Sequence, residues 1–214
     1  MHGWGGSIDS FRALANRLSD EYMVTLIDLY GFGETPHPDH PLCLDDYAFG
    51  VEEIIKDCED PILIGHSFGG RVALRIAARD RIVRGLVLID SAGMPPRRSL
   101  NYYRKIFAYK IAKLFGKTPR NAGSADYAAL TGPMRRTFVN IVNESNVPDA
   151  RVITVPTILL WGEKDRDTPL YMCRKMHALI QSSEMIVISD AGHFSYLERP
   201  DYAYCVIRAF CGGI

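Results

Sequence analysis

The chain has 214 residues, of which 47% are hydrophobic, 10% aromatic and 23% charged. This length suits one domain, or one domain with a modest insertion, and the composition excludes a disordered, collagen-like or coiled-coil chain. The 25 Lys and Arg residues balance the 25 Asp and Glu residues, so the overall charge does not indicate a nucleic-acid-binding protein. The function is therefore expected to come from a localised site.

The cysteines and apolar runs bear on metal sites and on the compartment. The chain has five cysteines, an odd number at wide spacing and without a CxxC pair, so neither a disulfide framework nor a zinc cluster is predicted. No apolar run approaches the roughly 18 residues of a membrane span, and the first ten residues lack the features of a signal peptide. We therefore expect a cytoplasmic protein without a membrane span or a metal site.

Short β-branched apolar runs alternate with segments of helical periodicity, which is typical of a parallel sheet covered by helices. Ile8, Phe11, Leu14, Ala15 and Leu18 fall on one helical face, and further helices are predicted at 44–58, from 72 to 78, and at 202–210. Five strands are predicted, at 23–28, 61–64, 86–90, 155–161 and 184–188. The expected fold class is α/β, with a mostly parallel sheet flanked by helices.

The stretch 94–150 interrupts this alternation. It has no strand-like run, and it carries ten Lys or Arg residues against three acids, so its net charge is +7 and that of the remainder is −7. We interpret it as a small helical cap inserted into a core made of 1–93 and 151–214. The cap begins after the predicted strand at 86–90 and ends before the one at 155–161. It is therefore expected to cover the carboxyl edge of the sheet, where ligands bind in open α/β sheets. Aromatic and apolar cap residues are then candidates for the substrate-binding wall: Tyr102, Tyr103, Phe107, Tyr109, Leu114 and Phe115.

The strongest local motif is Gly65-His66-Ser67-Phe68-Gly69, which lies between a predicted strand and a predicted helix. A G-x-S-x-G turn needs small residues around the serine, because the strand must turn sharply and leave the serine exposed at the sheet edge. A glycine-rich turn that only packs is the alternative. The context favours a nucleophilic serine.

Four other segments accompany this motif in order: 2–7 (HGWGGS), 28–33 (DLYGFG), 161–165 (WGEKD) and 190–193 (DAGH) followed by 198–200 (ERP). Together with the serine turn they resemble the α/β-hydrolase family, over nearly the whole chain except 94–150. The resemblance implies that 2–7 is the oxyanion loop, that 161–165 carries the acid of a catalytic triad, and that 190–193 carries its histidine.

In this interpretation Ser67 is the nucleophile, His193 the base and Asp165 the acid. A serine hydroxyl is a poor nucleophile near neutral pH, so it needs a base within hydrogen-bond reach and a carboxylate that orients the base. The chain order Ser67, Asp165, His193 is that of the family. Three carboxylates remain alternatives for the acid: Asp167, Glu163 and, more weakly, Asp90.

Acyl transfer also develops a negative oxygen, which backbone N–H groups must meet. The resemblance assigns these N–H groups to Phe68 and Trp4, although Trp4 has an alternative role as a buried aromatic lid. His66, inside the turn, is expected to support it rather than react. No cofactor is expected, and His37 and His40 lack a third metal ligand nearby.

The chain departs from the family at its start, because relatives begin with a β-hairpin and a strand that leads into the oxyanion loop. Here the sequence begins at the loop, so roughly twenty residues or more, about three strands' worth, are absent. Either the start is truncated or misassigned, or the fold closes up without these strands. If the fold closes up, the 23–28 strand can pair directly with 61–64, and Trp4 is then expected to be anchored only by its own helix.

The expected function is hydrolysis of a carboxylic ester or thioester through an acyl-enzyme on Ser67. The alternatives are cleavage of C–C bonds or amino-terminal proline peptides on the same fold, a slow ligand-binding receptor-like protein, and a fragment unable to fold. The HGWG and GHS segments with a basic cap also resemble the pimeloyl-acyl-carrier methyl ester esterases, whose partner is an acidic carrier protein. The substrate is therefore expected to be a small ester, possibly anionic or carrier-bound, unless the basic cap is simply a solvated face.

Overall fold

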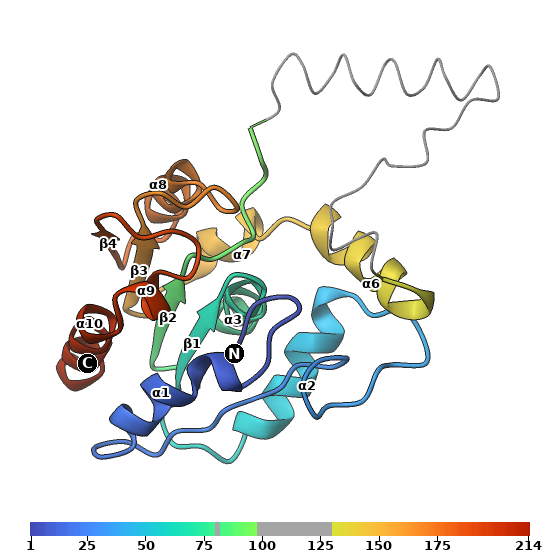
Figure 1. Ribbon diagram of the computed structural model, residues 1–214, viewed down its shortest axis with the longest axis horizontal. Coiled ribbons are helices and arrows are strands. Elements are labelled where there is room, and N and C mark those ends of the chain that lie inside the picture. The colour runs from blue at the N-terminus through green and yellow to red at the C-terminus, as the bar shows by residue number, and fades with distance from the viewer. Residues whose placement is uncertain (80–81, 98–129) are drawn as a thin grey trace.

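The computed structural model describes residues 1–79, 82–97 and 130–214. Four parallel strands form one sheet in the order β1-β2-β3-β4. All four match predicted strands, with ends shifted by at most two residues, and they are shown in Figure 1. Because the strands are parallel, their carboxyl ends meet at one edge of the sheet. Their bounds are β1 (Ile62–His66), β2 (Gly85–Ile89), β3 (Thr157–Gly162) and β4 (Ser183–Ile188).

Helices cover both faces of this sheet. Successive side chains of β2 point to opposite sides, so Leu86 and Leu88 join one apolar cluster while Val87 and Ile89 join the other. This burial on both faces explains why the strands are nearly continuous apolar runs. The first cluster is covered by α2 (Leu44–Ile55), α3 (Phe68–Arg79), α7 (Val147–Val152) and α8 (Leu170–Leu179), and the second by α1 (Asp9–Leu18), α9 (Ser195–Glu198) and α10 (Pro200–Gly213).

The prediction of a strand at 23–28 is wrong. The segment is extended but forms no ladder with β1, and a cavity of about 470 Å³ lies along it, lined in part by Val24, Leu26, Ile62 and Ile64. Val24 and Leu26 pack on the cluster around α1 and α10, while Ile27 packs on the opposite cluster. The apolar side chains of Val24, Leu26 and Ile27 are half-buried against these clusters, whereas Met23 is exposed. Strand pairing additionally requires a neighbouring backbone within hydrogen-bond distance, and this segment lacks one.

Met1 occupies part of the β1 edge instead. Its backbone nitrogen donates to the Ile64 carbonyl at 2.8 Å, and the His66 amide donates to the Met1 carbonyl at 3.1 Å. The segment that follows, 2–7, is thereby placed against the end of β1. The expectation that Trp4 is anchored only by its own helix is wrong, because the preceding Met1 is hydrogen-bonded to β1 and the His2 carbonyl accepts from the Gly69 amide of α3.

Of the predicted cap, 94–97 and 130–150 are described. All six candidate wall residues lie outside the described residues: Tyr102, Tyr103, Phe107, Tyr109, Leu114 and Phe115. The helix α6 (Gly132–Asn143) packs against the loop between α1 and α2, and the Leu42 amide donates to Thr137 Oγ1 at 2.9 Å. The buried Arg71 of α3 donates to the carbonyls of Ile141 and Glu144, at the end of α6. Within the described part of the chain, no helix is long and apolar enough to cross a membrane.

Candidate active site

Ser67 lies in the turn between β1 and α3 with φ of +49°, in the left-handed region that non-glycine residues rarely adopt. Its amide donates to the Ile89 carbonyl at 3.1 Å, which ties the turn to β2. The flanking glycines are required by space: a Cβ on Gly65 would overlap the backbone of Gly69, and a Cβ on Gly70 would overlap the Ser91 side chain. The sharp strand-to-helix turn is thus possible only with this pattern of small residues.

The turn brings Ser67 together with His193 and Asp165. Ser67 Oγ lies 3.0 Å from His193 Nε2, and His193 Nδ1 lies 2.9 Å from Asp165 Oδ2. Asp165 follows β3 and His193 follows β4, so all three side chains meet at the carboxyl edge of the sheet. The Asp165 side chain is fully buried and that of His193 is 13% exposed, which shields the pair from water. The three residues form one continuous chain of hydrogen bonds.

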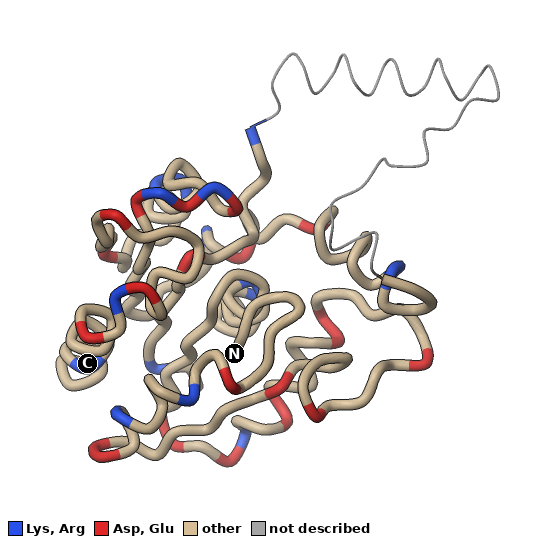
Figure 2. The backbone as a smooth tube through the Cα atoms, viewed as in Figure 1, with Lys and Arg blue, Asp and Glu red and all other residues tan. Residues whose placement is uncertain are grey.

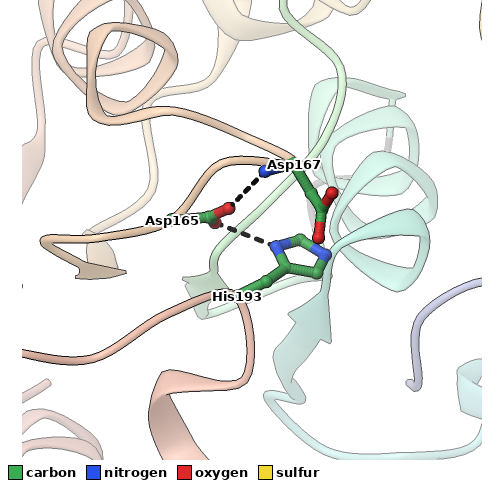
Figure 3. A group of neighbouring side chains, drawn as sticks. All are labelled: Asp165, Asp167 and His193. Carbon is green, nitrogen blue, oxygen red and sulfur yellow. Dashed lines mark hydrogen bonds and ion pairs between the residues drawn. The ribbon is translucent and has the colours of Figure 1, made fainter.

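Asp165 is held by several further donors. The amides of Asp167 and Thr168 donate to its Oδ1 at 2.8 and 3.0 Å, and Thr168 Oγ1 lies 2.7 Å from Oδ2. Figure 3 shows the His193 ring pointing one nitrogen at this carboxylate. Burial opposes ionisation of Asp165, but the hydrogen bonds from His193 and Thr168 outweigh it and lower the pKa of the carboxyl group. The carboxylate is therefore ionised where it contacts the imidazole.

The other candidate acids lie elsewhere. The Asp167 side chain is exposed, and its backbone rather than its carboxylate bonds to Asp165. Glu163 accepts a hydrogen bond from the Asp190 amide at 3.1 Å. Asp90 is fully buried and accepts hydrogen bonds from Gly162 and Ser195. Of these four carboxylates, Asp165 is the one that hydrogen-bonds to the His193 ring.

The two histidines of the site have opposite electrostatics. An ionised carboxylate can only accept, so His193 carries its proton on Nδ1 and leaves Nε2 free to accept from the Ser67 hydroxyl. Burial works against protonation of His193, but the hydrogen bond and charge of Asp165 outweigh it and raise the pKa of the ring. His66 is buried and its Nε2 donates to the His193 carbonyl at 2.8 Å; burial lowers its pKa to about 4. His66 thus supports the histidine loop as a neutral ring.

The loop at 2–7 approaches the serine turn from the other side. His2 Nδ1 donates to the Gly3 carbonyl at 2.7 Å, and His2 Nε2 accepts from the Leu29 amide at 3.1 Å, so this buried ring is neutral and fixed. The Gly69 amide donates to the His2 carbonyl at 3.0 Å. Among the described residues, neither the Trp4 amide nor the Phe68 amide has a hydrogen-bond acceptor. Both are free to bind a negative oxygen.

The Trp4 ring packs in an aromatic group beside this turn. Its centroid lies 4.9 Å from that of Phe32, 5.2 Å from Phe68 and 5.1 Å from Phe138, each in an edge arrangement. Phe138 comes from α6, so a helix of the predicted cap contacts the candidate oxyanion loop directly. The two predicted roles of Trp4 are compatible with each other, because the oxyanion role concerns its amide and the aromatic-lid role concerns its ring.

The described residues include one group of side chains with the ligand types and spacing that a metal would need. Asp165, Asp167 and His193 each offer a donor atom, and these atoms lie within 4.8 Å of one another (Figure 3). Two of these three side chains already have partners: Asp165 accepts several hydrogen bonds, and His193 pairs with Ser67. Asp167 is exposed, as acidic loop residues usually are.

Two residues that support the site were not predicted from the sequence. Thr168 bonds to the candidate acid, and Phe138 packs on Trp4. A threonine three residues after an aspartate is the spacing of a local side-chain turn and could have indicated Thr168. Phe138 offered no such signal, since its contact depends on how α6 lies over the sheet.

Comparison with known proteins identifies the family of the chain. A model of the alpha/beta hydrolase family matches residues 1–204. The AB hydrolase superfamily protein YisY of Bacillus subtilis is 26% identical over 239 residues, covering 98% of this chain and 89% of that protein. A pimeloyl-[acyl-carrier protein] methyl ester esterase of Neisseria meningitidis is 28% identical over 242 residues, covering 100% of this chain and 92% of that protein.

Solved structures show the same fold. A meta-cleavage product hydrolase from Pseudomonas fluorescens superposes with a TM-score of 0.76 at 20% identity, covering 99% of this chain and 89% of that one. A thermophilic esterase from Thermogutta terrifontis superposes with a TM-score of 0.75 at 22% identity, covering 99% and 88%. The family model matches residues 1–204 and the solved structures share the fold, so the chain belongs to the alpha/beta hydrolase family.

Proposed function

We propose that this protein hydrolyses a carboxylic ester or thioester through an acyl-enzyme formed on Ser67. The observation that carries the proposal is the unbroken hydrogen-bond chain from Ser67 Oγ through His193 to Asp165, with links of 3.0 and 2.9 Å. A serine, an imidazole and a buried carboxylate in this order are the groups that acyl transfer requires. The relative from Neisseria meningitidis that is named as a methyl ester esterase aligns over the whole chain and supports the same reaction class.

In the acylation step, Ser67 Oγ attacks the carbonyl carbon while its proton passes to His193 Nε2. The tetrahedral intermediate carries a negative oxygen. We propose that the backbone amides of Trp4 and Phe68 donate hydrogen bonds to this oxygen. His193 then gives the proton to the leaving alkoxide or thiolate, and the acyl group stays on Ser67. Asp165 keeps the Nδ1 proton in place and stabilises the imidazolium that forms in this step.

In the deacylation step, water takes the place of the leaving alcohol or thiol. His193 accepts a proton from this water as its oxygen attacks the acyl carbon, and returns the proton to Ser67 Oγ when the acid product leaves. No cofactor takes part in either step. Cleavage of C–C bonds on the same fold is the alternative. The meta-cleavage product hydrolase among the solved structures, at 20% identity, shows the fold alone.

The proposal is tested with a fluorophosphonate label and a short p-nitrophenyl ester. The parent is expected to label and to turn over, and Ser67→Ala is expected to do neither, because it lacks the attacking oxygen. Ser182→Ala changes an exposed serine that bonds to Val155, and should behave like the parent. Labelling of Ser67→Ala at the parent's rate would show that another residue is the nucleophile. A folded parent without turnover would favour the ligand-binding alternative.

The substrate is proposed to be anionic or attached to an acidic carrier. Nine acids and one lysine lie between 34 and 60, whereas 94–150 has a net charge of +7. Figure 2 shows acidic positions gathered around α2, apart from the basic position on α6. Such separation of charge steers an anionic partner toward the basic side. The Neisseria relative, named for an acyl-carrier-protein ester, supports this assignment.

Salt and charge reversal test this part of the proposal. The double variant Arg135→Glu/Arg136→Glu reverses two adjacent positions on α6. The value of kcat/KM for an anionic ester should fall with added salt and fall in this variant, while a neutral ester responds to neither change. Arg174→Glu/Lys175→Glu, an adjacent pair on α8, is the matched control. Equal responses of both esters would mean that the basic segment is a solvated surface.

A further inference from the structure

Asp90 is a buried carboxylate that acyl transfer does not use. It follows β2 directly, its side chain is fully buried, and its φ of +44° lies in the left-handed region. Its amide donates to the Leu160 carbonyl of β3 at 3.0 Å, so its backbone is fixed to the neighbouring strand. A non-glycine residue in this conformation is strained, and such strain persists only where the surroundings hold the residue in place.

The carboxylate of Asp90 joins the two loops that carry the acid and the base. Its Oδ1 accepts from the Gly162 amide at 2.7 Å, and Gly162 stands three residues before Asp165. Its Oδ2 accepts from the Ser195 amide at 3.1 Å and from Ser195 Oγ at 2.6 Å, and Ser195 stands two residues after His193. One side chain therefore sets the distance between the end of β3 and the histidine loop.

The backbone of Asp90 adds a link to the acid itself. Its carbonyl lies 2.9 Å from Thr168 Oγ1, and the same hydroxyl lies 2.7 Å from Asp165 Oδ2. Three donors meet the Asp90 carboxyl group, the Gly162 amide and the amide and hydroxyl of Ser195, and they offset part of the hydration that the group loses on burial. Burial still raises the pKa of Asp90, to about 7, and the nearby charge of Asp165 acts in the same direction.

We propose that Asp90 is a positioning residue, which holds the loops of Asp165 and His193 at the spacing that their hydrogen bond and the approach to Ser67 require. This inference rests on the proposed serine chemistry and assigns Asp90 a part in it without contact with substrate. It also explains why a carboxylate, rather than its amide, stands at this position. Both sides of the group face N–H donors, and an amide can accept on only one side.

The test uses variants that break this bridge in different ways. Asp90→Asn keeps the shape but turns an NH₂ group toward either Gly162 or Ser195, so one loop is released. Ser195→Ala removes a single donor and keeps the carboxyl group of Asp90 in place. The control Ile207→Val shortens a fully buried side chain of α10 that has no hydrogen bond to the site.

The first readout is the second-order rate of Ser67 labelling by a fluorophosphonate, below the melting temperature of every variant. Asp90→Asn is expected to label about tenfold or more slowly and Ser195→Ala about threefold, the scale of a misplaced catalytic group. The double variant should be no slower than Asp90→Asn, since both act through one bridge. Ile207→Val should melt earlier but label at the parent's rate.

The second readout is the pKa of His193, followed by NMR, which requires no activity. Ser195→Ala should lower it, because a looser Asp165 stabilises the imidazolium less. Asp90→Asn should lower it too, but part of that decrease comes from loss of the Asp90 charge, which itself raises the pKa of His193, so Ser195→Ala carries this readout. A folded Asp90→Asn or Ser195→Ala that keeps both the parent's labelling rate and its His193 pKa overturns the inference. A parent that does not label overturns the proposed serine chemistry instead, and the His193 pKa then decides the positioning role. Should Asp90→Asn not fold, Ser195→Ala decides both readouts.

Discussion

The space around Gly65 allows the serine turn to be tested by adding one methyl group. A Cβ at Gly65 would lie 2.6 Å from the Gly69 carbonyl carbon and 2.7 Å from the Gly70 nitrogen, far inside contact distance. These atoms belong to the first turn of α3, so no side chain can swing aside to relieve the overlap. Overpacking typically costs about 1–3 kcal/mol, and a backbone overlap should reach the upper end, about 3 kcal/mol.

Gly65→Ala should therefore melt well below the parent. For a protein of this size each kcal/mol lowers Tm by about 2–4 °C, so the expected decrease is about 6–12 °C. Relief of the overlap moves α3 and with it Ser67, and a displacement of about 1 Å should slow fluorophosphonate labelling about 100-fold.

Gly213→Ala is the matched control, because a Cβ at Gly213, in α10, meets no atom within 4 Å. It should melt within about 2 °C of the parent, as surface substitutions usually change stability by less than about 0.5 kcal/mol. Melting is followed by circular dichroism and labelling by mass spectrometry. A Gly65→Ala protein with the parent's Tm and labelling rate would refute the argument that the turn requires glycine at this position.

Three other outcomes are expected. The value of kcat/KM should fall as pH decreases through the raised pKa of His193, because the base must be neutral; a pH profile without such an acid limb would exclude His193 as the base. Arg71→Met should lower Tm by several degrees, since it leaves the carbonyls of Ile141 and Glu144 without their buried donor, at about 1–3 kcal/mol; an unchanged melting curve would contradict this. Hydrogen exchange should be faster for the amides of 24–27 than for those of β1, and equal protection would mean that the extended segment is paired.

The sheet edge explains why much of the site could be predicted from sequence. Ser67, Asp165 and His193 each follow an apolar run by at most five residues, and parallel strands end at a common edge. The position of each residue just after a predicted strand was therefore enough to predict that the three side chains lie close together. The run at 23–28 is also rich in apolar residues, but its side chains are at most half-buried. Its prediction failed because apolar residues alone do not supply the partner backbone that a β-ladder needs.

The supporting groups could not be found in this way. Asp90 meets Ser195 across 105 positions of the chain, and Thr168 meets Asp90 across 78. Neither contact leaves a local pattern, because each depends on how two strand ends and two loops pack. Asp90 was weighed as an acid because it ends a strand, and its distinct role is visible only from the donors that surround it.

The two histidines of the site differ in protonation because their hydrogen-bond partners differ, although both rings are largely buried. Their rings lie 4.9 Å apart and both are largely buried, an environment that lowers the pKa of either ring. His66 gives its Nε2 proton to a carbonyl, which has no net charge, so burial prevails and the ring stays neutral above pH 5. His193 faces the ionised Asp165, whose charge outweighs burial. His66 is held neutral, whereas His193 can gain a proton. In the proposed mechanism the proton of Ser67 therefore passes to His193 Nε2, and the same nitrogen donates it to the leaving group.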